Sequence, residues 1–201
     1  MDLGPKQLEL LRSMVPKLSS VCLLLNPANP SIPLYLKSVQ AAAQKLGLKV
    51  LLLEAGTPEA IEKAFSVMTE QKAGAVIIPL DGLFSQQRNR IAELAAKHRL
   101  PSISSAKENV EAGGLMSYGQ NRGEGMFRTA AYVDKIFKGA NPGDLPVEQP
   151  IKVELVINAK SAKALGLAVP QSLLISADKV IPTGLSRGRG GHDLPGRPRS
   201  G

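Results

Sequence analysis

The sequence contains no tryptophan, one cysteine and two histidines among 201 residues, and only 3% of its residues are aromatic. The single cysteine, Cys22, excludes a disulfide within the chain, and its place inside an apolar run predicts a buried thiol. With so few aromatic residues, a hydrophobic core has to be built from aliphatic side chains. The length suits one ordinary domain, or one domain with an incomplete second one.

Residues that commonly perform catalysis are sparse. His98 falls at the end of a predicted helix and His192 near the C-terminus, and neither has the spacing of a metal site or a catalytic triad. No P-loop and no G-x-G-x-x-G pattern follows a predicted strand. Asp81 has the position of a nucleophilic aspartate directly after a strand, but no second catalytic group accompanies it. We therefore expect no enzymatic activity, no cofactor and no metal.

Long apolar runs are also missing. No segment reaches the length of a membrane span, and the first residues have neither the apolar core nor the cleavage site of an export signal. The chain as written therefore predicts neither membrane insertion nor export.

The net charge of +8 is unevenly distributed. The last stretch, "GLSRGRGGHDLPGRPRSG", holds four arginines against one aspartate, a net +3 of the +8. We expect residues 183–201 to form a disordered basic tail. Its Arg-Gly pairs are compatible with RNA binding, but a terminus without such a role is the favoured interpretation, and we expect no nucleic-acid partner.

Short apolar runs alternate with amphipathic stretches over the first hundred residues. The pattern predicts strands at 21–25, 49–54, 75–80 and 100–104, and helices at 4–16, 33–46, from Thr57 onward, and at 85–98. Gly47 is the expected C-cap of one helix, and Thr57 is the expected N-cap of the next. This alternation predicts an α/β fold, in which parallel strands form a sheet with helices on both faces.

The alternation of short apolar runs and amphipathic stretches ends at about residue 111. A short strand is expected within 111–119, then a helix at 123–139 and a proline-rich connector at 140–150. A further strand at 152–158 and a helix at 159–167 complete the predicted elements.

Polar residues follow each of the first four strands, in the loops "NPANPS", "EAGTPE", "DGLFSQ" and "SSAKEN". Ligands of open parallel sheets bind beyond the carboxyl ends of the strands, so these loops predict a site for a small polar molecule. Each such residue is also an ordinary turn or cap residue, so the prediction depends on the cluster. The expected ligand-binding residues are Asn26, Asn29, Ser31, Asp81, Ser85, Ser104 and Lys107.

Five segments in order resemble one known family: "KQLELLRSMVPKLSSVCLLLNPANP", "RIAELAAKHRLPSI", "EAGGLMSYG", "AAYVDKIFKGANPGDLPVEQP" and "KVELVINAKSAKALGLAVPQSLL". They are similar to ABC-transporter substrate-binding proteins of the branch often described as tryptophan/tyrosine transport-system binding proteins. The resemblance covers about residues 6–181 and implies the type I periplasmic-binding fold. Such proteins have two lobes that close on a small solute, often an amino acid, and deliver it to a membrane permease without catalysis.

The resemblance also implies a domain arrangement. Residues 1–114 would form the second lobe, 115–145 would cross to a mostly missing first lobe, and 146–182 would return to the second. "NPANPS" would be a cleft-facing loop stiffened by its prolines. Members of the family normally begin with an export signal and most of a first lobe, and the full-length protein would be periplasmic or on the cell surface.

Two consequences concern particular residues. Crossing elements without their own sheet would leave apolar side chains such as Met126 and Phe127 without partners. Relatives often carry aromatic residues where this chain has "SSAKENVEAGG", so Ser104, Ala106 and Asn109 predict a smaller and more polar cleft wall, which disfavours aromatic amino acids as ligands.

Three other interpretations remain open from the sequence. The same fold serves as the ligand-sensing domain of regulators, although these residues contain no helix-turn-helix. An enzyme of flavodoxin-like architecture would depend on Asp81. A truncated gene product that folds but binds nothing tightly is the third.

Overall fold

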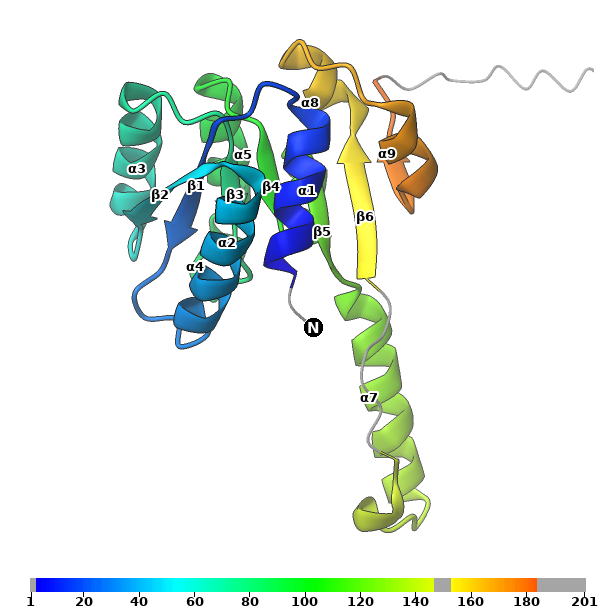
Figure 1. Cartoon of the computed structure of the whole chain (residues 1–201). Helices are drawn as coiled ribbons and strands as arrows, with labels where there is room; N and C mark the ends of the chain where they lie inside the picture. The colour runs from blue at the N-terminus through cyan, green and yellow to red at the C-terminus, as the bar shows by residue number, and fades with distance from the viewer. Residues whose placement is uncertain (1–2, 147–152, 184–201) are drawn as a thin grey trace, which may run out of the picture.

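The computed structural model describes residues 3–146 and 153–183, apart from the side chains of residues 122–124 and 126–128. Its strands form one seven-stranded sheet in the order β2-β1-β3-β4-β5-β6-β7 (Figure 1). The strands are β1 (Ser20–Leu25), β2 (Lys49–Glu54), β3 (Val76–Ile78), β4 (Ser102–Ser104), β5 (Met116–Gln120), β6 (Val153–Asn158) and β7 (Lys179–Ile181). All neighbouring pairs are parallel except β5 and β6.

Helices connect the strands and cover both faces of the sheet. They are α1 (Gly4–Met14), α2 (Ile32–Leu46), α3 (Pro58–Glu70), α4 (Gly82–Gln86), α5 (Arg88–Lys97), α6 (Lys107–Glu111), α7 (Arg122–Phe137), α8 (Ala159–Ala164) and α9 (Gln171–Ser176), with a short 3₁₀ helix at Pro142–Asp144. Two of the predicted caps are confirmed. Thr57 Oγ1 accepts a hydrogen bond from the Ala60 N–H, and Gly47 ends α2 in the left-handed conformation, with φ of 66°.

The two faces of β1 pack into two separate hydrophobic cores. Val21, Leu23 and Leu25 point to the core under α1 and α2, whereas Cys22 and Leu24 point to the core under α3 and α5. Successive side chains of a strand face opposite sides, so an uninterrupted apolar run is needed when helices cover both faces. The α/β fold predicted from the sequence is confirmed.

Several elements differ from the sequence prediction. β6 runs antiparallel to β5, because the chain leaves the sheet at the end of β5 and re-enters from the same edge. The helix predicted at 85–98 is two helices, and the first begins at Gly82 because Asp81 caps it. β3 is only three residues long and ends before Pro79, which cannot donate to a strand ladder. β7 and α9 were not predicted.

α7 follows β5 and projects away from the sheet (Figure 1). Its described apolar side chains include Phe137, which is 86% exposed, and the partly exposed Val133 and Ile136. The side chains of Met126 and Phe127, for which exposure was expected, lie outside the described residues. No described helix is long and apolar enough to cross a membrane.

Burial raises the pKa of Cys22 to about 12, from a usual value of 9.0. We expect the thiol of the folded chain to resist thiol reagents at about pH 8 and to react only on unfolding. Above pH 9 the thiol ionises in the unfolded chain while it stays protonated in the folded one. The free energy of unfolding should therefore fall as the pH rises from 9 toward 12. The expected loss between pH 9 and pH 10 is about 1 kcal/mol.

Urea unfolding at pH 8 and pH 10, for this chain and for Cys22→Ala, measures this linkage. The unsubstituted chain should lose more stability between the two pH values than the variant does. Equal losses would show that Cys22 does not contribute.

Candidate functional site

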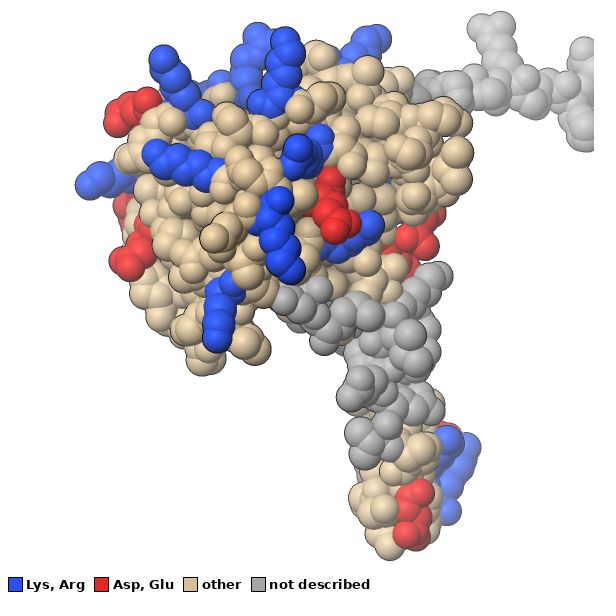
Figure 2. Space-filling view, viewed as in Figure 1, with Lys and Arg blue, Asp and Glu red and all other residues tan. Residues whose placement is uncertain are grey.

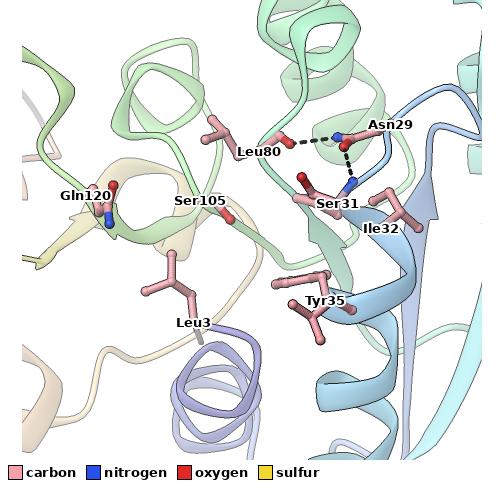
Figure 3. A pocket seen from close by; sticks show the side chains of 10 residues that line it. Leu3, Asn29, Ser31, Ile32, Tyr35, Leu80, Ser105 and Gln120 are labelled. Carbon is pink, nitrogen blue, oxygen red and sulfur yellow. Dashed lines mark hydrogen bonds between the residues drawn. The ribbon is translucent and has the colours of Figure 1, made fainter. Parts of the chain in front are cut away.

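The carboxyl ends of β1, β3, β4 and β5 meet at one edge of the sheet, which is the edge from which α7 projects. A hollow of about 450 Å³ lies there (Figure 3). Its lining comes from the loops after β1, β3 and β4, the end of β5, the residue that precedes α1, and the first turn of α2. The lining residues are Leu3, Asn29, Ser31, Ile32, Leu34, Tyr35, Pro79, Leu80, Ser105 and Gln120.

Most of the surface area of this lining is apolar, and two of its leucines are well exposed. Leu34 is 79% exposed and Leu80 is 51% exposed. Exposed leucines at the rim of a hollow are typical of a surface that another group covers. The polar lining groups are Asn29, Ser31, Tyr35, Ser105 and Gln120, and no described lining residue is charged.

The loop after β1 is tied to the loop after β3 by the buried carboxylate of Asp81 (7% exposed). Both oxygens of Asp81 accept hydrogen bonds from Asn26 Nδ2, at 3.1 Å each, and Asn29 Nδ2 donates to Asp81 Oδ2 at 2.9 Å. The N–H groups of Leu83 and Phe84 donate to Asp81 Oδ1 at 2.8 and 3.3 Å. The carboxylate is therefore saturated by protein donors and serves to hold the two loops together.

The two asparagines also hold their own loop. Asn26 Oδ1 accepts from the Ala28 N–H and Asn29 Oδ1 from the Ser31 N–H, at 3.1 and 3.0 Å. These are Asx turns, in which a side chain replaces a backbone acceptor. Asn29 Nδ2 additionally donates to the Leu80 carbonyl at 3.1 Å. Figure 3 shows Asn29 between Ser31 and Leu80, so the lip of the hollow is rigid before any solute arrives.

The floor beside Ser105 is held by a buried glutamine. Gln7 of α1 is fully buried, and its Nε2 donates to Ser105 Oγ at 3.1 Å and to the Tyr118 carbonyl at 2.9 Å. Its Oε1 accepts from the Tyr35 hydroxyl. The glutamine thus links α1, α2 and the loop after β4, and it fixes two of the polar groups that face the hollow.

The structure separates the predicted site residues into three groups. Asn29 and Ser31 line the hollow. Asn26, Asp81 and Ser85 lie behind the lip, where Ser85 Oγ donates to the Asp81 carbonyl at 2.7 Å. Ser104 and Lys107 are not part of the lining. Ser104 is 1% exposed and donates to the Ala106 carbonyl at 2.8 Å.

Lys107 lies near the base of α7 instead. Its Nζ is 3.9 Å from Glu154 Oε2, and Glu154 Oε1 accepts from Asn121 Nδ2 at 2.6 Å. The lysine pairs with Glu154 at the junction of α6, β6 and α7. The positive charge that was expected at the hollow therefore lies outside its lining.

The three residues that predict a smaller, more polar wall after the fourth strand do not line the hollow. Ser104, Ala106 and Asn109 are buried, and the residues of that side that reach the hollow are Ser105 and Gln120. The loop "EAGTPE" also contributes nothing to the lining. β2 is the edge strand, so its loop lies on the far side of β1 from β4 and β5.

Sequence reasoning missed the contributions of α1, α2 and β5 to the site. Gln7 had a signal, because it precedes Leu11 and Met14 by four and seven residues and so lies on the apolar stripe of its helix. Leu3, Tyr35 and Gln120 had no comparable signal. Among the described residues, no group of three or more His, Cys, Asp or Glu side chains is placed to hold a metal.

A family model described as "ABC transporter substrate binding protein" matches residues 2–181. The curated "Tyrosine-binding protein" of Clostridioides difficile (strain R20291) is 23% identical over 162 residues, which are 81% of this chain and 47% of that protein. The chain therefore spans about half the length of the curated relative it matches.

Two solved structures share the fold with a TM-score of 0.79 each. One is an ABC domain of Streptococcus pneumoniae in complex with L-Trp, 27% identical, covering 90% of this chain and 62% of that one. The other is a conserved domain protein of Vibrio cholerae, 24% identical, covering 90% and 60%. The family is one of binding proteins, which agrees with the expectation that this chain is not an enzyme. On the match over residues 2–181, the chain belongs to the ABC transporter substrate-binding protein family.

Proposed function

We propose that this chain forms one wall of an interlobe cleft that captures an amino acid with a large apolar side chain for an ABC importer. The observation that carries the proposal is the hollow of about 450 Å³ at the carboxyl edge, with its apolar rim and hydrogen-bonded lip. The bound L-Trp in the pneumococcal relative supports this class of solute.

The chemistry of the lining suits an uncharged apolar side chain with a zwitterionic backbone. Leu34 and Leu80 offer apolar area that a solute side chain would remove from water. Ser31, Ser105 and Gln120 can hydrogen-bond the ammonium and carboxylate groups of the solute. α2 begins beside the hollow, and the positive end of its dipole favours the carboxylate.

The lobe arrangement is part of the proposal. In this arrangement, residues 1–114 and 146–182 belong to one lobe, and α7 reaches toward the other. The crossing segment expected at 115–145 includes β5, which is a strand of the described sheet. The second lobe would close over the rim, and the rigid lip would reduce the entropy lost on binding. A membrane permease would receive the solute, in a periplasmic or cell-surface location.

Ligand fluorescence tests the proposal directly. The chain has no tryptophan, so the emission of added L-Trp reports on the ligand without a protein tryptophan background. We expect saturable binding of L-Trp. Binding of L-Asp or L-Lys would be seen as displacement of L-Trp, and we expect no comparable binding of either, because no described lining residue provides an opposite charge. Absence of saturation up to about 10 mM, a binding free energy weaker than about 3 kcal/mol, would contradict the proposal.

A variant at the rim locates the binding. Leu34→Asp should weaken L-Trp binding about tenfold, because a carboxylate replaces apolar contact area at the rim. Ile175→Asp is the matched control, since Ile175 is a helical residue of similar exposure (76% against 79%) that does not line the hollow. Equal effects of the two substitutions would place the solute elsewhere.

A further inference from the structure

The edge of the sheet opposite the hollow carries a concentration of cations. This edge holds the first residues of strands β1 to β4 and the last residues of helices α1, α2, α3 and α5. It also holds the start of α8, because β6 runs in the opposite direction. Figure 2 shows lysine and arginine side chains along this edge, at the top of the view. The exposed cations of this amino edge are Arg12, Lys17, Lys45, Lys49, Lys72, Lys97, Arg99, Lys160 and Lys163.

None of these nine side chains forms an ion pair with a described residue. The ion pairs of the described chain use the cations Lys6, Arg90, Lys107, Lys138 and Lys179. In the described parts of the chain, two acidic residues end helices on the same edge: Glu70, and Glu111, which pairs with Lys179 at 3.2 Å. The amino edge therefore has a large excess of uncompensated positive charge.

Two of the cations occupy positions where glycine is more favourable. Lys72 and Arg99 follow the ends of α3 and α5 with φ of 53° and 52°, in the left-handed region. Gly47 and Gly166 serve the same purpose after α2 and α8, with φ of 66° and 74°. A side chain at such a position adds backbone strain, so the charge is present there despite a conformational cost.

Helix dipoles account for only part of the pattern. Cations in the last turn of a helix, such as Arg12, Lys45 and Lys97, are stabilised by its negative end. Lys17 lies in a loop and Lys49 is the first residue of β2, where no helix end provides that stabilisation.

We propose that the amino edge is a docking surface for an anionic phospholipid membrane. The cations are distributed across several elements instead of around one pocket, which suits a diffuse plane of negative headgroups. Among the described residues, no exposed phenylalanine or tyrosine lies near these cations to stack on bases, as single-stranded nucleic acid requires. Because the hollow lies at the opposite edge, a chain docked in this way keeps its solute site open to water.

Vesicle sedimentation with the full 201-residue chain tests this surface. The vesicles are phosphatidylcholine alone, or phosphatidylcholine with about one third phosphatidylglycerol. We expect binding only to the anionic vesicles, and release when salt is raised from about 0.05 M to about 0.5 M, because screening shortens the reach of surface charges. Equal binding to neutral vesicles would overturn the proposal.

A pair of charge-matched variants localises the effect. Lys17→Gln, Lys49→Gln, Lys72→Asn and Arg99→Asn together should weaken binding to anionic vesicles at least about tenfold, and Asn tolerates the left-handed conformation of the last two positions. Lys37→Gln, Lys63→Gln, Arg88→Gln and Lys138→Gln remove the same charge from exposed positions outside the amino edge. Both variants keep the basic tail, so its contribution cancels.

The outcomes separate the possible partners. A strong loss in the first variant with a small loss in the second supports the amino edge. Equal losses would show an effect of net charge alone and overturn the proposal. Binding of polyglutamate through the same four cations, without binding to anionic vesicles, would overturn it in favour of an acidic protein partner.

Discussion

Replacing Gly119 with alanine is expected to lower the free energy of unfolding by about 3 kcal/mol and to abolish solute binding. A β-carbon at this position would lie 1.9 Å from the Ser105 carbonyl oxygen and 2.7 Å from its carbonyl carbon. Neither atom can move alone, because both belong to the backbone that leaves β4 across β5. Relief of the clash has to displace Ser105, which lines the hollow.

Urea unfolding measures the stability of Gly119→Ala, and L-Trp titration measures its binding. Gly82→Ala is the matched control, because a β-carbon there meets nothing within 4 Å. The control should retain both stability and binding. If Gly119→Ala is as stable as the control, the close approach of β4 and β5 is not a constraint in solution.

Replacing Asp81 with alanine should cost about 3 kcal/mol of stability and weaken solute binding at least about tenfold. The substitution leaves the Asn26 and Asn29 amides and the N–H groups of Leu83 and Phe84 without their shared acceptor. The lip of the hollow would then lose the link that orders it before binding.

Thr57→Ala is the appropriate comparison for Asp81→Ala. Thr57 also caps a helix, since its Oγ1 accepts one hydrogen bond from the Ala60 N–H, but its loop does not line the hollow. We expect a loss of about 1 kcal/mol and unchanged solute binding. Asp81→Ala with full binding affinity would refute the role of the carboxylate in ordering the lip.

Local sequence patterns predicted most of the fold because its first half is built from local units. The caps at Gly47 and Thr57 depend on interactions within a few residues. The apolar run at β1 indicates a strand buried on both faces before its partners are known. The reversal of β6 could not be obtained in this way. The direction of β6 depends on where the chain re-enters the sheet after α7. The apolar pattern of a strand is the same whether the strand is parallel or antiparallel to its neighbour.

The site was predicted in location more than in composition. The loops after β1, β3 and β4 do meet, as the rule for open parallel sheets requires. Loop position did not distinguish a side chain that faces the hollow from one that holds the loop. Asn29 lines the hollow and also holds the loop, whereas the Asp81 carboxylate only accepts hydrogen bonds from neighbouring protein groups. This difference depends on contacts between residues 52 positions apart.

The antiparallel pairing of β5 and β6 has a consequence for the modularity of the fold. The pair has the geometry of a β-hairpin, from Met116 opposite Ile157 to Gln120 opposite Val153. Everything between Gln120 and Val153, α7 included, is topologically an insertion into the turn of that hairpin. Register is set by the pairs themselves, so an insertion here can change in length and content while the strands keep their places. The sheet can thus accept additional structure at this one junction without being rebuilt.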